Sequence, residues 1–286
     1  MIPLAQLKQN LEFNKSLGGI VDVLKVSAAV QLRRLQGGVH GYQPFAQQLR
    51  EAARLLDVRG IEHPFVAARQ DLPSCTVVIT SDEGFAGELN TLLVNAALDT
   101  RDAARSDQLV VLGERGACAL EELNESFVAF PGVPEELNAA HVAALKRYLV
   151  EGSLAGRFGR VVVVYAKFVS MTSQHIEEEQ VLPSRALFEE ERRPPRPAHP
   201  CVVEPSGTQV IEGLVSLRLD VTLSTLFISS KLAELAARVM HLEGSDQELS
   251  RMQHQLGLQY VKHRHALADT SIREISASRH VLKGER

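Results

Sequence analysis

The residues whose types and spacing could do chemistry gather in one segment, residues 81–90, which reads Ser-Asp-Glu-Gly-Phe-Ala-Gly-Glu-Leu-Asn. It joins a β-branched run to a helical pattern, a setting in which glycines let a backbone cradle an anion at a helix N-terminus. Asp82 and Glu83 would repel a phosphate, however, and no G-x-x-x-x-G-K-[ST] run occurs. We therefore predict a structural turn with no cofactor, in which the glycines allow unusual φ and the polar side chains accept from free helix N–H groups. The residues of this turn are Ser81, Asp82, Gly84, Gly87 and Asn90.

Other residues capable of chemistry do not form a recognisable site. His263 and His265 are two positions apart on a predicted helix, so they point to different faces, and no carboxylate or cysteine pattern completes a metal site. The scattered Ser, His and Asp residues lack the context of a nucleophile elbow. The three cysteines Cys75, Cys118 and Cys201 are widely spaced, which indicates a reducing compartment and neither a disulfide framework nor a zinc site. We predict no catalytic residue, no metal and no cofactor.

The elements that would position these residues begin with a long C-terminal helix. Residues 206–286 contain no proline and only five glycines, and apolar residues recur at spacings of three and four. Ser206 and Gln209 form the pattern of a capping box at its start. One helix of that length would be ~100 Å long, since each residue adds ~1.5 Å. Such a helix needs a partner along its length, so a mechanical or architectural function is favoured.

The N-terminal segment predicts that partner. From Leu4 to Leu35, seven of ten heptad core positions are apolar, which is typical of a coiled coil, although Lys25 falls at one of them. Gly18 and Gly19 interrupt the pattern. They indicate either a frayed or bent helix or a place where two backbones approach closely. Residues 44–56 resume a helical pattern.

The middle of the chain predicts an α/β layer. Residues 76–80, 109–112 and 161–165 are short apolar runs without alternation, as expected of strands covered on both faces. Helical patterns at 87–104 and 135–151 separate them, and a last short strand is expected at 201–203. The predicted fold class is α+β with an α/β insert: a long antiparallel coiled coil of the two terminal helices and a Rossmann-like domain. The predicted domains are residues 1–57, 58–205 and 206–286.

Composition narrows the classes of function. Hydrophobic residues make up 45% and charged residues 23%, which is typical of a globular protein, and no apolar run reaches the ~18 residues of a membrane span. The N-terminus shows no signal or transit pattern. The net charge of −4 divides into +3 at residues 1–57, +3 at 260–286 and −10 between them. Cationic ends on an acidic body indicate an acidic partner, either nucleic acid or protein.

Three stretches together resemble the gamma subunit of F-type rotary ATP synthases. Residues 80–90 are similar to that family's S-D-x-G-x-x-G-x-L-N turn, and residues 24–34 (Leu-Lys-Val-Ser-Ala-Ala-Val-Gln-Leu-Arg-Arg) resemble its alanine-rich first helix. Residues 237–240 (Ala-Arg-Val-Met) and 260–264 (Tyr-Val-Lys-His-Arg) resemble the two signatures of its last helix. The resemblance runs from about residue 4 to 282. Substitutions at Glu83, Val261, His265 and Asp269 mark a divergent member.

The resemblance implies a function and partners. The chain would be the central stalk that couples ion flow through a membrane ring to ATP synthesis or hydrolysis at an alpha–beta hexamer, on the cytoplasmic face of a bacterial inner membrane. It would meet the alpha and beta subunits, the epsilon subunit and the c-ring, with no nucleic acid and no small-molecule substrate. Val203 and Glu204 would meet epsilon and the ring. The residues that would meet the alpha–beta collar are Lys262, Arg264, His265, Leu267, Ile272, Ile275, Val281 and Leu282.

Two alternatives stay open. A gamma-like paralogue could act outside the motor as a binding or regulatory module for an acidic partner or nucleic acid, although exposed aromatics for stacking are scarce. A small-molecule enzyme could use the α/β layer, although no constellation of residues in the sequence supports it.

Overall fold

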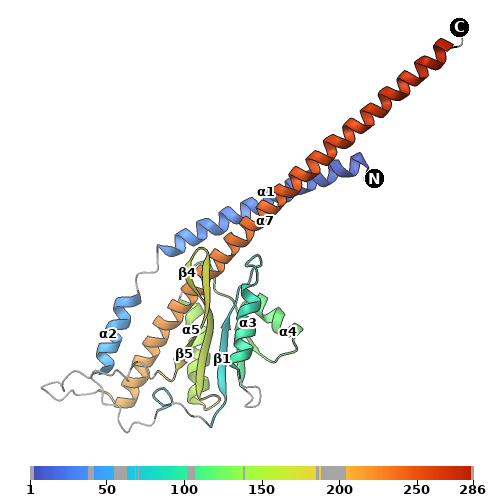
Figure 1. Cartoon of the computed structure of the whole chain (residues 1–286). Coiled ribbons are helices and arrows are strands. Elements are labelled where there is room, and N and C mark those ends of the chain that lie inside the picture. The colour runs from blue at the N-terminus through green and yellow to red at the C-terminus, as the bar shows by residue number, and fades with distance from the viewer. Residues whose placement is uncertain are drawn as a thin grey trace. The chain divides into compact units, whose positions relative to one another are not determined.

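The computed structural model describes residues 3–37, 42–54, 63–67, 69, 71–101, 107–137, 139–184, 187 and 204–284, with side chains at 42–44, 54 and 277–284 excepted. The chain divides into two compact units. One unit combines Met1–Ser27 with Met240–Arg286, and the other is Ala28–Val239. Two helices run through both units, α1 (Leu4–Gln36) and α7 (Gly207–Gly284) (Figure 1). The division predicted at residues 57 and 205 stays a prediction, since compact units follow contacts rather than chain segments.

A five-stranded sheet forms the centre of the unit Ala28–Val239, with strand order β3-β2-β1-β4-β5. The strands are β1 (Ser74–Ile79), β2 (Gln108–Leu112), β3 (Val128–Phe130), β4 (Arg160–Ser170) and β5 (Ser173–Leu182). The strands β1 to β4 are parallel to one another, and β5 is antiparallel to β4. The three strands that the apolar runs predicted are confirmed as β1, β2 and β4.

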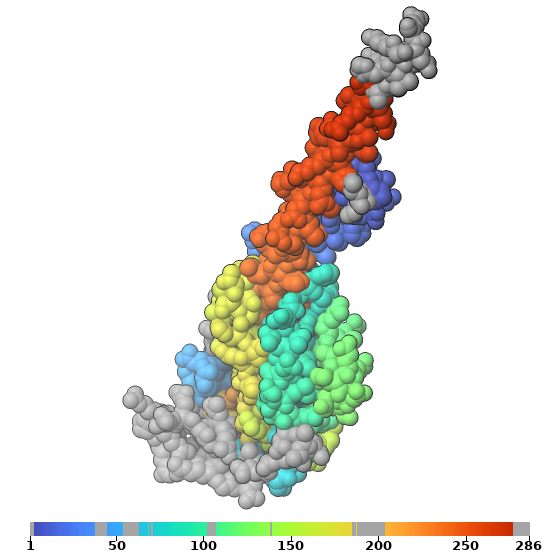
Figure 2. All heavy atoms as spheres, turned by 45° about the vertical axis from the view of Figure 1, so that its right-hand side comes forward, coloured from blue at the N-terminus to red at the C-terminus, as the bar shows by residue number. Residues whose placement is uncertain are grey.

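Helices cover both faces of the sheet. They are α3 (Leu89–Thr100) and α4 (Glu114–Glu122) on one face, and α5 (Ala139–Leu154) with the first part of α7 on the other. The helix α2 (Tyr42–Arg54) adds Ala53 to the core on the α5 face. Because side chains alternate along a strand, Val77 and Val163 face the core that α5 and α7 share, while Val78 and Val164 face the core under α3. Figure 2 shows α3 and α4 side by side on the outside of the molecule, over the core that contains Val78 and Val164. Every central strand is thus buried on both faces, which explains the unbroken valine runs.

Three elements were not predicted. β3 has three residues and α4 has nine, too few to give a clear period. β5 reads Ser-Gln-His-Ile-Glu-Glu-Glu-Gln-Val-Leu and contains no apolar run until its end, because it is the edge strand of the sheet. The strand predicted at residues 201–203 lies outside the described residues.

The start of α7 follows the predicted capping pattern in part. The Gln209 backbone N–H donates to Ser206 Oγ at 3.3 Å, as an N-cap requires. The Gln209 side chain accepts from the Ser206 hydroxyl at 3.2 Å instead of reaching the backbone N–H of Ser206. The predicted N-cap is therefore confirmed. The prediction of a full capping box was wrong, because the Gln209 side chain bonds to the Ser206 hydroxyl and not to the Ser206 backbone N–H.

In the unit of Met1–Ser27 and Met240–Arg286, α1 and α7 lie antiparallel. Gln253 Nε2 donates to the Asn14 carbonyl at 3.0 Å, while Lys25 Nζ lies 2.8 Å from Asp246 Oδ2, so positions rise along one helix as they fall along the other. A Cβ on Gly18 would come 3.3 Å from Gln253 Nε2. That atom is the end of a flexible side chain, so a close approach of two backbones at Gly18 stays a prediction, while α1 continues unbroken through Gly18 and Gly19. The predicted fold class, a helix pair of the chain ends with an inserted α/β domain, is confirmed.

Candidate functional site

The place where a parallel sheet of this order usually binds a ligand is occupied by the chain itself. Open sheets of this type bind ligands beyond the carboxyl ends of their strands, at the point where the strand order reverses. In this sheet that point lies between β1 and β4. Residues 229–238 of α7 cross that place. The Phe168 N–H at the end of β4 donates to Ser229 Oγ at 3.2 Å, and Ala233 packs in the core with Val78 and Val164. A nucleotide would have to displace this helix.

The turn at residues 81–90 follows β1 and lies at the same carboxyl ends of the strands. The Ser81 N–H donates to Asn90 Oδ1 at 3.1 Å, and Asn90 Nδ2 donates to Ser81 Oγ at 2.8 Å. These two bonds tie the start of the turn to the first turn of α3. Gly87 has a φ of 60°, as predicted, but the other left-handed position is Phe85, at 66°, and not Gly84. A Cβ on Gly84 would lie 3.1 Å from the guanidinium of Arg115, the end of a flexible and exposed side chain.

Asp82 caps a helix other than the one that follows it. Its Oδ1 accepts from the Glu114 N–H at 3.1 Å, at the start of α4, and from the Gly132 N–H at 3.2 Å. The residue before α4, Gly113, has no side chain to cap with and a φ of 100°. Asp82 therefore supplies the N-cap acceptor for α4 from a distant segment, and its carboxylate holds two loops together.

Replacement of Asp82 by alanine should lower the free energy of unfolding by about 1–2 kcal/mol, because two backbone donors lose their acceptor. Asp82→Asn keeps an acceptor oxygen and should lose less than half as much. Thermal unfolding of the two variants followed by circular dichroism measures the difference. Equal losses in both variants would contradict a capping role and indicate a role for the charge alone.

Arg238 of α7 holds the turn from the other side. Its Nε donates to the Gly84 carbonyl at 3.1 Å, its Nη1 lies 2.9 Å from Glu83 Oε2, and its Nη2 lies 2.6 Å from Glu234 Oε1. Glu234 also pairs with Lys231, whose Nζ lies 3.1 Å from both carboxylate oxygens. Arg238, Glu234 and Lys231 are all buried. Burial raises the pKa of Glu234, and the two cations act against that rise.

This buried cluster fastens α7 to the turn and has no feature of an active site. Each polar atom of Arg238 that is named above is satisfied by the protein, so none is presented to a substrate. Cys75 is buried in β1, and burial raises the pKa of its thiol to about 12, which removes it as a nucleophile. Among the described residues there is no group of three His, Cys, Asp or Glu that could hold a metal ion. In the same residues no helix is long and apolar enough to cross a bilayer.

A second candidate site is the exposed surface of the helix pair in the other unit. The α7 residues Leu267, Ile272 and Ile275 are each more than half exposed, and Lys262, Arg264 and His265 are exposed as well. The side chains of Val281 and Leu282 lie outside the description, as does Val203, whereas Glu204 is described and exposed. The structure brings the six described α7 residues onto one exposed stretch of helix. Their contacts with other proteins remain predictions.

The helix α1 carries an exposed apolar face that was not predicted from the sequence. Phe13 is 68% exposed, Ile20 59% and Val23 69%, while Leu7 and Val21 are buried. Phe13 and Ile20 are seven residues apart, so they repeat on one side of the helix. The heptad count assigned only the side that meets α7, although a second stripe at the same period was visible in the sequence. Such an exposed apolar face is a candidate interaction surface.

Lys25 lies between the two helices with three carboxylates. Its Nζ lies 2.8 Å from Asp246 Oδ2, 3.2 Å from Glu243 Oε2 and 3.3 Å from Asp22 Oδ1. The hydrogen bond to Asp246, followed by that to Glu243, raises the pKa of Lys25 above its ordinary value. The Gln247 amide, followed by Lys25, lowers the pKa of Glu243. A single cation at a core position therefore joins the two helices through ion pairs.

Acidification should loosen this helix pair. The pKa of Glu243 is lower in the folded chain than its ordinary 4.5, so its contribution is present above that pH and is lost as the pH falls through the lowered value. Double electron–electron resonance between spin labels at positions 13 and 258 should show a broader distribution of label-to-label distances at pH 3 than at pH 7. In Lys25→Met the distribution should change less with pH. Distributions identical at both pH values in the unsubstituted pair would contradict this role.

Comparison with known proteins gives one consistent result. A family model described as ATP synthase matches residues 3–282. The ATP synthase gamma chain of Trichlorobacter lovleyi is 27% identical over 290 residues, which cover 99% of this chain and 100% of that relative. The ATP synthase gamma chain of Geotalea uraniireducens is 26% identical over 294 residues, with coverage of 99% and 100%.

Solved structures share the fold. A chain of the rotor of Euglena gracilis mitochondrial ATP synthase has a TM-score of 0.68 and 16% identity, and the match covers 93% of this chain and 98% of that one. A chain of the central stalk and c-ring of Tetrahymena thermophila mitochondrial ATP synthase has a TM-score of 0.57 and 21% identity, with coverage of 79% and 99%. The motifs, the fold and the match over nearly the whole length agree, and the chain belongs to the ATP synthase family, among whose gamma chains its relatives are found.

Proposed function

We propose that this chain is the gamma subunit of an F-type ATP synthase, the central stalk of its rotor, and that it couples ion flow through a membrane ring to ATP synthesis or hydrolysis. The observation that carries this proposal is the family match over residues 3–282, which includes both chain-terminal helices and the α/β domain. A paralogue that had left the motor would have no need to keep both helices and the domain together.

The physical basis of the function is differential contact. An asymmetric helix pair that meets several equivalent catalytic interfaces touches each of them differently, so each is held in a different state. Turning the pair exchanges those states and the nucleotide affinities that go with them. The chain itself then needs no catalytic residue, which agrees with the blocked ligand site between β1 and β4.

The alpha and beta subunits are the partners proposed for the exposed helix pair. Leu267, Ile272 and Ile275 of α7 are each more than half exposed in the isolated chain, as expected of a surface that works inside a bearing. Lys262 and Arg264 supply cations just before them in the sequence. Val281 and Leu282, further along the same helix, and His265, next to Arg264, are proposed as contacts with the same subunits.

The epsilon subunit and the c-ring are the partners proposed for the region of Val203 and Glu204. This assignment is carried over from the family resemblance, and Glu204 is exposed, as it requires. The proposed location is the cytoplasmic face of a bacterial inner membrane, where the ring would lie.

Reconstitution tests the proposal. The full chain should co-elute with the alpha and beta subunits encoded by the same organism, and the complex should hydrolyse ATP faster than the alpha–beta mixture without the chain. The chain alone should have no ATPase activity. A chain that neither binds the alpha–beta mixture at low salt nor changes its ATPase rate would overturn the assignment.

The same preparation addresses the two alternatives. Duplex DNA binding that falls steeply with salt would support a nucleic-acid module, and none is expected, because the described exposed residues include few aromatics for stacking. A shift of the melting temperature of the isolated chain by nucleotides would support an enzyme, and none is expected where α7 occupies the switch point of the sheet.

A further inference from the structure

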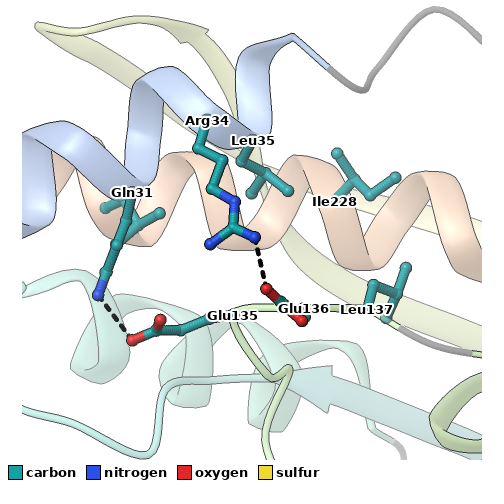
Figure 3. Close-up of a pocket in the computed structure, with 8 residues that line it drawn as sticks. Gln31, Arg34, Leu35, Glu135, Glu136, Leu137 and Ile228 are labelled. Carbon is teal, nitrogen blue, oxygen red and sulfur yellow. Dashed lines mark hydrogen bonds and ion pairs between the residues drawn. The ribbon is translucent and has the colours of Figure 1, made fainter.

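A pocket of about 250 Å³ lies within the unit Ala28–Val239 and is not part of either site described above. Three elements form it: the end of α1, the loop before α5 and the first part of α7 (Figure 3). Its floor is apolar and consists of Leu35, Leu137, Ile228 and Leu235. All four belong to one hydrophobic cluster of the unit. An apolar floor of this size accommodates a phenyl ring or a short alkyl chain.

The rim of the pocket is polar and carries an excess of negative charge. Gln31 Nε2 donates to Glu135 Oε1 at 2.6 Å, and Arg34 Nη2 donates to Glu136 Oε1 at 2.6 Å. Figure 3 shows these two pairs reaching across from α1 to the loop. One guanidinium faces two carboxylates, so the formal charge of the rim is −1. Both carboxylates are exposed at the rim.

We propose that this pocket binds a small organic cation with an apolar body, such as an arylalkyl ammonium. The apolar body would lie on the leucine and isoleucine floor, and the ammonium would donate to the Glu135 and Glu136 carboxylates at the rim. The two carboxylates repel a phosphate or a carboxylic acid, so nucleotides and fatty acids are excluded as ligands. No nucleophile and no buried acid–base pair lines the pocket, so it binds without catalysis.

The test uses the full chain and 2-phenylethylammonium as probe, with the isosteric neutral 2-phenylethanol as comparison. Methyl NMR of Leu35, Leu137, Ile228 and Leu235 should show saturable shifts with a Kd on the order of 1 mM, as expected for a probe of this size. The alcohol should bind about two- to fivefold more weakly, because the ion pair at an exposed rim contributes little. Equal affinities of the amine and the alcohol, or shifts that do not saturate, would overturn the proposal.

A charge-matched pair of variants locates the effect. In Glu135→Gln with Glu136→Gln the preference for the amine over the alcohol should disappear, since both acceptors lose their charge. Both side chains are exposed, so folding should be retained. Glu51→Gln with Glu248→Gln changes the net charge equally at exposed positions outside the pocket and should keep the preference. Loss of the preference in this second variant would assign the effect to net charge and overturn the site.

Discussion

Arg238→Met should lower the free energy of unfolding of the Ala28–Val239 unit by about 3–5 kcal/mol, the cost of leaving a buried charge without its partner. Glu234 would keep only Lys231, and the Gly84 carbonyl would lose its donor. The loss should be near the lower end of this range, because Lys231 remains. Urea unfolding followed by tyrosine fluorescence measures it, since Tyr148 and Tyr165 both lie in this unit.

Two further substitutions separate charge from geometry. Glu83→Gln should cost no more than about 1 kcal/mol, because the Glu83 side chain is 70% exposed and its ion pair is screened by water. Arg238→Lys should fall between Glu83→Gln and Arg238→Met, because an ammonium keeps the charge but cannot reach three acceptors as a guanidinium fork does. A loss in Arg238→Met no larger than in Glu83→Gln would show that the buried cluster is not what fastens α7 to the turn.

The pH dependence gives an independent check on Arg238→Met. Arg238 acts against the rise in the pKa of Glu234, so its removal should raise that pKa further. A carboxyl group whose pKa is higher in the folded chain than in the unfolded chain favours folding more as the pH falls through the folded value. The destabilisation by Arg238→Met should therefore become smaller on acidification from pH 7. A loss that stays constant or grows would contradict this assignment of the buried charge.

The double substitution Ile20→Asp with Val23→Asp should weaken binding to the alpha–beta complex at least about 100-fold. Each apolar side chain that a partner buries contributes about 1.5–3 kcal/mol, and a buried carboxylate adds a cost of its own. In the isolated chain both side chains are exposed, so the free energy of unfolding should change by no more than about 0.5 kcal/mol. Pull-down and urea unfolding of the same protein measure the two effects.

A control on other exposed apolar residues makes this result specific. Leu123→Asp with Leu154→Asp adds the same charge at exposed leucines of the unit Ala28–Val239. This control should keep its affinity for the alpha–beta complex. Equal affinity of both double variants and the unsubstituted chain would show that the apolar face of α1 is not covered in the complex. The proposed function would then need another contact surface on the helix pair.

The sequence by itself determined the long helices and the central strands. The spacing of apolar residues from 206 onward, without proline, predicts a helix and gives α7, and the valine runs give β1, β2 and β4 because strands buried on both faces need no alternation. The ordered motifs also gave the family, since each of them occupies a local segment of the chain. These features depend on neighbours in sequence, which is why they were visible without a structure.

Contacts between distant segments could be decided only by the tertiary structure. Asp82 caps α4, thirty-two positions further on, and Arg238 binds the Gly84 carbonyl from a distance of 154 positions. Arg238 belongs to a motif that the sequence revealed, but nothing local indicates that its side chain is buried against Glu83 and Glu234. The edge strand β5 was missed for a related reason, because only its pairing with β4 makes a strand of an acidic segment. Whether a charged side chain is solvated or buried depends on which segments fold over it, and the local pattern does not contain that information.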